Sequence, residues 1–148
     1  MCNYYEEDQK WEDFHERMRM IRAYLNNEFQ RDYIPMTMVR PTNKAPVVLQ
    51  GQEQQEVRMG RFGLVPVWAK DPKAMKSTMN ARSETVLEKP MWKRPFMKQR
   101  ALVPATAFFE WDKKSTTKKK MRVTYKDGEP FCFAGLWDRS VIVKVVVA

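Results

Sequence analysis

Apolar residues near the start of the chain recur every three or four positions, which places them on one face of an α-helix. This apolar stripe consists of Trp11, Phe14, Met18, Ile21 and Leu25. The pattern predicts one long amphipathic N-terminal helix. His15, the only histidine of the chain, would lie on the polar side of that helix, where a histidine is more often solvated than catalytic.

From Pro35 onward the pattern changes to short apolar runs separated by prolines and polar turns, which is typical of strands and loops. Strands are predicted at 47–49, 57–64, 122–125 and 131–136, with one more short strand in the tail 139–148. Asp127-Gly128 has the backbone freedom of a tight hairpin between two of these strands. Residues 113–120 contain five lysines and predict a mobile loop. The whole pattern predicts an α+β fold, mostly antiparallel sheet.

Length and composition limit the class of protein. The 148 residues suffice for one domain with a core, and 43% hydrophobic residues is a globular composition. No apolar run reaches the roughly 18 residues that span a bilayer, and the polar, acidic start does not resemble an export signal. We therefore expect no membrane partner, a cytoplasmic location (at the nucleoid in a bacterium), and free thiols at Cys2 and Cys132.

Charge is unevenly distributed along the chain. Residues 1–32 carry eight acidic and five basic side chains, a net charge of −3, whereas the remainder carries 22 basic and 10 acidic ones, a net charge of +12. Concentrated positive charge favours a polyanionic partner such as nucleic acid. A lysine-rich surface that only maintains solubility is the alternative.

Cys2 is the first residue with distinctive chemistry. Removal of Met1, which the small second residue favours, would leave an α-amine and a thiol on adjacent carbons. The ordinary pKa values of such groups, about 8 and about 8.5, leave a nucleophilic fraction of each at neutral pH. A 1,2-aminothiol condenses with an aldehyde to an imine, which sulfur then closes to a five-membered thiazolidine. A cysteine at position 2 by chance is the alternative.

Three further segments carry residues suited to a site. Asn80 can donate to an oxygen or accept from an amine, and Arg82 offers a planar fork for phosphate, although this segment also fits a helix or turn start. Glu110 stands among aromatic residues and can shuttle protons as an imine forms, or be an ordinary salt-bridged residue. Trp68, close to Lys70, suits stacking on an unpaired base, although most tryptophans belong to cores. Two cysteines and one histidine make no metal site, and no phosphate-binding glycine motif occurs, so neither metal nor cofactor is expected.

Taken in order, these segments resemble one protein family. The matching motifs are Met1-Cys2, residues 41–46, 62–70, 80–85, 102–104, 108–111 and 133–137. They are similar to the SRAP family, the SOS response-associated peptidases, also described as abasic-site processing or DNA–protein crosslink proteins. The similarity runs from residue 2 to about residue 138.

The resemblance implies a sheet-rich α+β fold with a barrel-like β core and a positively charged groove for single-stranded DNA. It implies a catalytic set in which Cys2 forms a thiazolidine with an abasic site. In that set Asn80 holds the sugar oxygen or the amine, and Glu110 assists proton transfer. The residues that it implies for DNA binding are Arg82, Trp68, Trp111 and Asn43.

Three differences from the family pattern matter. Asn3 and Tyr4 replace the usual Gly-Arg after the cysteine, and Phe62 stands where a tryptophan is usual. The family also continues beyond Phe-Ala-Gly-Leu-Trp to a His-x-Arg-Met-Pro segment with a catalytic histidine, which has no match in this sequence. We therefore expect a single domain over residues 1–148 that lacks the family's C-terminal portion.

The sequence thus predicts a DNA-repair protein that senses abasic sites in single-stranded DNA and crosslinks to them through Cys2, with a lyase-type activity. A non-catalytic single-strand binder is the first alternative. A cysteine peptidase, the activity in the family's name, is the second, and no cysteine–histidine pair is evident for it.

Overall fold

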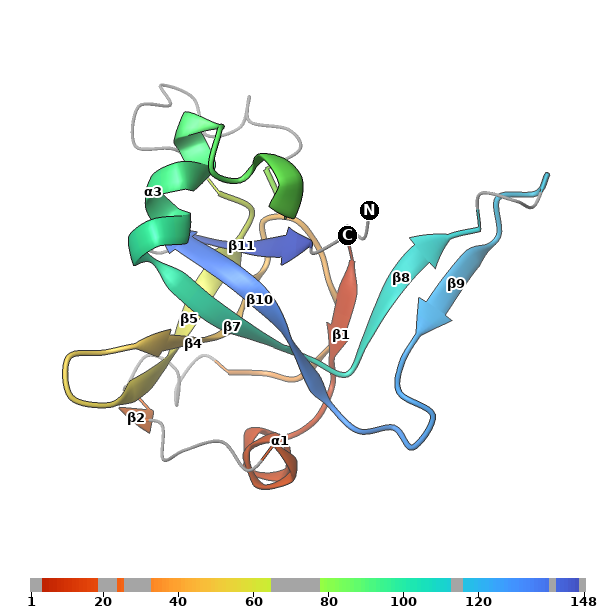
Figure 1. Cartoon of the computed structure of the whole chain (residues 1–148). Coiled ribbons are helices and arrows are strands. Elements are labelled where there is room, and N and C mark those ends of the chain that lie inside the picture. The colour runs from red at the N-terminus through yellow and green to blue at the C-terminus, as the bar shows by residue number, and fades with distance from the viewer. Residues whose placement is uncertain are drawn as a thin grey trace.

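The computed structural model describes residues 4–18, 24–25, 33–64, 78–112, 116–138 and 141–146, and its strands form two sheets (Figure 1). The strands are β1 (Tyr5–Glu7), β2 (Tyr24–Leu25), β3 (Met36–Val39), β4 (Lys44–Gln50), β5 (Gln55–Phe62), β6 (Asn80–Arg82), β7 (Arg100–Ala105), β8 (Ala107–Trp111), β9 (Lys120–Val123), β10 (Phe131–Asp138) and β11 (Val141–Val146). The helices are α1 (Trp11–Arg17), the short 3-10 helix η1 (Ser83–Thr85) and α3 (Pro90–Lys98). In this part of the chain no helix is long and apolar enough to cross a membrane.

The seven-stranded sheet closes on itself. Its order is β2-β5-β4-β7-β10-β11-β6, and an additional parallel pairing joins β11 to β5. The strands β5, β4, β7, β10 and β11 therefore form a ring, in which every pairing except β11–β5 is antiparallel. Closure removes the free edges that a strand otherwise exposes. This ring is the barrel-like core, and the mostly antiparallel α+β class is confirmed.

Alternation along the strands distributes apolar side chains between separate clusters. In β4, Val47 and Leu49 pack in a first cluster, while Val48 between them packs in another, beneath α1. The first cluster contains Tyr5, Val39, Ala45, Val47, Leu49, Phe62, Ala101, Val103 and Ala105. Another, beside α3, contains Leu64, Ala81, Val86, Trp92 and Leu136. Strand β4 thus buries apolar residues on both of its faces.

The four-stranded sheet has the order β3-β1-β8-β9. Tyr5 of β1 belongs to the first apolar cluster, so this sheet shares that core with the barrel. Two of its strands, β8 and β9, extend away from the barrel as a two-stranded ribbon (Figure 1). The side chains of Trp111, Met121 and Val123 on this ribbon are exposed.

The N-terminal helix is shorter than predicted. α1 ends at Arg17, and Leu25, expected on its apolar face, lies in β2 and pairs with Val57 of β5. Apolar spacing alone does not distinguish a continuing helix from a two-residue strand that bonds to a neighbouring sheet edge. The start of the stripe is confirmed, since Trp11 and Phe14 are buried.

The predicted hairpin around Asp127-Gly128 is also wrong. The turn itself is present, because Gly128 has a φ of 73° and its N–H donates to the Tyr125 carbonyl oxygen at 3.1 Å. However, β9 pairs with β8, whereas β10 pairs with β7 and β11. A turn sequence specifies local backbone conformation, but strand partners depend on which faces are buried. The tail does form the predicted strand, β11, between β10 and β6.

Candidate functional site

The N-terminal strand lies against the strand that carries Glu110. β1 pairs antiparallel with β8, and the Phe109 N–H donates to the Tyr4 carbonyl oxygen at 3.2 Å. Tyr4 therefore stands beside the residue that precedes Glu110. Cys2 and Trp68, both predicted for the site, lie outside the described residues, as does the side chain of His15.

Side-chain contacts fix β1 in this position. Arg122 Nε donates to Glu6 Oε2 at 2.8 Å, and the Thr106 hydroxyl donates to Asp8 Oδ1 at 2.7 Å. The backbone N–H of Thr106 also donates to the Glu6 carbonyl oxygen at 2.9 Å. Because Glu6 is almost fully buried, loss of its arginine partner would leave a poorly solvated charge. The contacts therefore hold the N-terminal strand in one register.

A second buried carboxyl group lies in the same strand. Glu7 is fully buried, and burial raises the pKa of its carboxyl group from 4.5 to about 8. The Tyr33 hydroxyl oxygen lies 2.6 Å from Glu7 Oε1 and 2.5 Å from the Gln9 carbonyl oxygen. Since a hydroxyl carries a single hydrogen, both short contacts are satisfied only when the carboxyl group supplies another. The geometry and the raised pKa both favour a neutral Glu7 at pH 7.

Glu110 and Trp111 are adjacent in β8 and point to opposite faces of the four-stranded sheet, because side chains alternate along a strand. Glu110 is half-buried and opposite Met121, whereas Trp111 is 53% exposed and opposite Lys120. The two residues, predicted for one site, therefore cannot contact the same group of a ligand.

Asn80 and Arg82 begin and end β6, an edge strand of the seven-stranded sheet. Ala81 between them is buried in the cluster beside α3, so alternation directs their side chains away from that cluster. Asn80 is half-buried and Arg82 is exposed. This arrangement leaves the Arg82 guanidinium accessible to an anion.

One apolar cluster connects the strands that carry Glu110 and Asn80. Phe108, two residues before Glu110, and Met79, one residue before Asn80, both pack against the first cluster, to which Tyr5 of β1 also belongs. Segments far apart in the sequence thus meet at a common core. The fold brings the strands of the predicted catalytic residues toward one region.

Asn43 has a structural role in the turn before β4. Its Oδ1 accepts from the Arg40 N–H at 2.8 Å, and its own N–H donates to the Arg40 carbonyl oxygen at 3.0 Å. Its carbonyl oxygen accepts from the Phe62 N–H at 2.8 Å, which joins the turn to β5. Asn43 and Arg40 also line a cavity of about 440 Å³ beside β3, so the predicted DNA contact would involve this turn.

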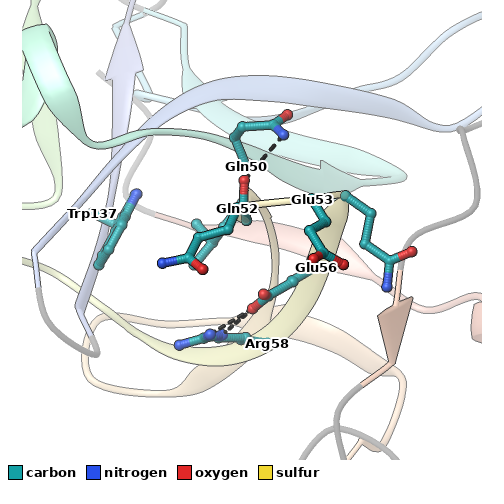
Figure 2. A pocket seen from close by; sticks show the side chains of 9 residues that line it. Gln50, Gln52, Glu53, Glu56, Arg58 and Trp137 are labelled. Carbon is teal, nitrogen blue, oxygen red and sulfur yellow. Dashed lines mark hydrogen bonds and ion pairs between the residues drawn. The ribbon is translucent and has the colours of Figure 1, made fainter.

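A further cavity, of about 520 Å³, lies between the β4–β5 turn and Trp137 (Figure 2). Its lining includes Glu53 and the ion pair of Arg58 with Glu56. Its two carboxylates disfavour a phosphate. None of the predicted site residues that the structure describes lines this cavity. We therefore place the candidate site along β1, β8 and β6.

Two features near β1 were missed at the level of the sequence. Lys120, assigned to a mobile loop, is the first residue of β9, and its Nζ lies over the Phe109 ring. The lysine-rich composition of this segment favoured a loop over a strand. Extending the alternation of the predicted strand back from Arg122 could have placed Lys120 in that strand. The contact of Glu7 with Tyr33 has no signal in the sequence, since no periodicity relates residues 26 positions apart.

Known proteins resemble this chain in sequence. The chain matches the family described as SOS response associated peptidase (SRAP) over residues 1–144. It is 31% identical over 140 residues to "Abasic site processing protein YoaM" of Bacillus subtilis, which covers 94% of this chain and 60% of that protein. It is 33% identical over 124 residues to "Abasic site processing protein HMCES" of Gallus gallus, covering 70% of this chain and 37% of that protein. The chain thus spans at most 60% of the length of these two relatives.

Solved structures show the same fold. A crystal structure of a Bordetella bronchiseptica protein superposes with a TM-score of 0.74 at 25% identity, covering 97% of this chain and 69% of that one. A Bacteroides thetaiotaomicron protein gives a TM-score of 0.74 at 22% identity, covering 99% and 67%. The fold of this chain is therefore shared with these solved structures.

Proposed function

The chain belongs to the SRAP family, and on this premise we propose that it senses abasic sites in single-stranded DNA and crosslinks to them through Cys2. The observation that carries the proposal is the register of β1 against β8. It places the start of the described chain beside the strand of Glu110.

Covalent geometry extends this observation toward the N-terminus. Two residues span at most about 7 Å, and Cys2 precedes by two positions Tyr4, whose carbonyl oxygen accepts from the Phe109 N–H. Because Glu110 directly follows Phe109, an aminothiol at Cys2 would act close to a group that can exchange protons. This supports joint action of Cys2 and Glu110.

The proposed reaction loses one water molecule overall. The amine nitrogen attacks the aldehyde carbon of the ring-opened abasic sugar, and the carbonyl oxygen leaves as water after taking up protons. The thiolate then attacks the imine carbon, and the nitrogen takes up a proton as the thiazolidine ring closes. In this scheme Glu110 donates a proton to the departing oxygen, and Asn80 holds the sugar oxygen or the amine.

The remaining predicted residues would bind the strand on either side of the reacting sugar. Arg82 is accessible for a phosphate, and Asn43 and Trp68 would lie along the same path. Because Trp111 faces away from Glu110, its exposed ring would stack on a neighbouring base and not on the reacting nucleotide.

The test is a denaturing gel of the protein with abasic and intact oligonucleotides. A heat-stable shifted band is expected with the abasic strand only, and Cys2→Ser should abolish it because a serine amine can form only a labile imine. Cys132→Ser is the matched control, since burial raises the pKa of the Cys132 thiol to about 12 and leaves it a poor nucleophile. An equally stable adduct from Cys2→Ser would refute the thiazolidine.

Reversible single-strand binding without chemistry is the second candidate, favoured by the net charge of +12 on the chain after residue 32. The same samples on a native gel distinguish the two functions. Equal binding of abasic and intact strands, with no heat-stable band from the wild type, would support the binder.

A further inference from the structure

Lys120 occupies an unusual position on the ribbon of β8 and β9. Its Nζ lies 4.1 Å from the centroid of the Phe109 ring and 5.4 Å from that of the Tyr4 ring. Both distances are within the range of a cation–π interaction. The ammonium is thus held where β1, β8 and β9 meet, beside the start of the described chain.

The face of the sheet that carries Lys120 is defined by the strand register. Lys120 is opposite Trp111, and cross-strand partners point to the same side, as do Phe109 and Trp111 along β8. The ribbon therefore presents an ammonium group next to an indole ring that is 53% exposed. A cation beside an accessible aromatic ring is the combination with which proteins bind single-stranded nucleic acid.

The charge of Lys120 is not compensated within the described part of the molecule. Glu6, on the same side of the sheet by alternation, is bonded to Arg122. The ion pairs found among the described residues do not include Lys120. Aromatic rings position an ammonium without neutralising it, so its hydrogens remain able to bind an anion.

We propose that Lys120 binds a backbone phosphate of the single strand, next to the abasic nucleotide, while Trp111 stacks on the adjoining base. This rests on the proposed function for the identity of the strand and adds a binding residue to it. Because its ammonium group lies over two aromatic rings, Lys120 positions the DNA strand and also contributes to its affinity. The lysines of the surrounding segment would not substitute for it.

The experiment compares three variants. Lys120→Met keeps an unbranched, mainly aliphatic side chain and removes the charge, whereas Lys120→Arg keeps the charge. Lys126→Met removes a lysine from the exposed Asp127-Gly128 turn and is the matched control. Binding of an intact labelled single strand is measured by fluorescence anisotropy over a series of salt concentrations, and adduct formation with an abasic strand is timed separately.

Lys120→Met should reduce the log–log salt slope by about 0.7, the value for one phosphate on a single strand, and weaken binding about fivefold near 0.1 M salt. Lys120→Arg and Lys126→Met should keep the wild-type slope. The adduct should form more slowly with Lys120→Met at sub-saturating strand. An unchanged slope for Lys120→Met, or an equal reduction for Lys126→Met, would overturn the proposal.

The two proposals fail separately in this design. If the wild type forms no adduct but Lys120→Met still flattens the salt slope, the crosslinking function is wrong and the phosphate contact stands. If the wild type forms the adduct and Lys120→Met leaves both slope and rate unchanged, the phosphate contact is wrong and the crosslinking function stands.

Discussion

The closed barrel and the N-terminal strand bury different kinds of residue. In the ring strands β4, β5, β7 and β10 the buried side chains are apolar, with Val47, Val57, Val103 and Leu136 as examples. In β1, by contrast, two of three buried residues are glutamates, Glu6 and Glu7. One carboxyl group is bonded to an arginine and the other to a tyrosine.

This difference indicates that one kind of buried residue stabilises the fold and the other positions the N-terminal strand. Apolar packing tolerates many combinations of residues with the right volume, whereas a buried carboxyl group needs a specific partner in a specific geometry. Apolar burial in the barrel therefore stabilises the fold without requiring one specific partner for each side chain. The partnered carboxyl groups orient β1 relative to β8.

The largest expected effect concerns Glu110, in the sheet that positions β1. Glu110→Gln keeps size and hydrogen-bonding capacity but cannot exchange a proton, so adduct formation should slow by about 10²- to 10⁴-fold. Single-strand affinity and stability should change little. Time courses with an abasic oligonucleotide measure the rate, and Glu88→Gln, on the exposed segment before α3, is the control. Equal rates for the wild type and Glu110→Gln would assign Glu110 a structural role only.

The next effect concerns the barrel. Leu136 is 1% exposed, and Leu136→Ala should lower the free energy of unfolding by about 2–5 kcal/mol through lost burial and a residual cavity. Leu102→Ala on the neighbouring strand β7 is the same substitution at a side chain that is 41% exposed, and should cost far less. Denaturant unfolding compares the two. Similar losses would contradict the assignment of stability to the barrel interior.

The sequence predicted the parts of the fold that follow from local pattern. The runs at 47–49 and 57–64 lie mainly in β4 and β5, and the turn at Asp127-Gly128 forms. It did not predict that β9 and β10, the strands on either side of this turn, belong to different sheets. Strand partners are chosen by burial across the whole domain, which no local pattern contains.

The candidate site was likewise predicted only as far as local sequence pattern reaches. The motifs identified Glu110, Trp111, Asn80 and Arg82 as site residues. They did not predict that Glu110 and Trp111 point to opposite faces of a sheet. Alternation within β8 contains this information once the strand is known, because neighbours in a strand always diverge. The Glu7–Tyr33 contact required the fold, since α1 and β2 lie between the two residues in the sequence.

A third prediction tests whether the N-terminal strand also affects stability. The pKa of Glu7 is raised to about 8 in the folded state from 4.5. Between these values the folded protein therefore binds more protons than the unfolded chain, and stability falls as pH rises. Glu7→Gln lacks this dependence, so from pH 5 to pH 8 the wild type should lose roughly 3–4 kcal/mol more than the variant.

Chemical denaturation at the two pH values measures this difference, with Glu88→Gln as an exposed control. The control should follow the wild type. If Glu7→Gln shows the same pH dependence as the wild type, Glu7 is charged in the folded protein and the Tyr33 hydrogen is shared between two acceptors.

The smallest effect concerns Arg82, which lies in the barrel sheet but is predicted to bind DNA. Its side chain is exposed at the end of β6, and its backbone pairing with Val146 of β11 survives truncation. Arg82→Ala should therefore leave stability unchanged and reduce the salt slope of single-strand binding by about 0.7. Arg58→Ala is the control, because Arg58 is paired with Glu56 in the cavity beside Trp137, and it should keep the wild-type slope.

Combining Arg82→Ala with Lys120→Met then tests whether one strand contacts both sheets. If Arg82 and Lys120 bind different phosphates of the same strand, their effects add, and the double variant should reduce the slope by about 1.4. If the double variant shows no greater reduction than either single variant, both cations act on one phosphate or the strand reaches only one of them. Additivity would mean that the DNA crosses from the edge of the barrel sheet to the ribbon, past the strand of Glu110.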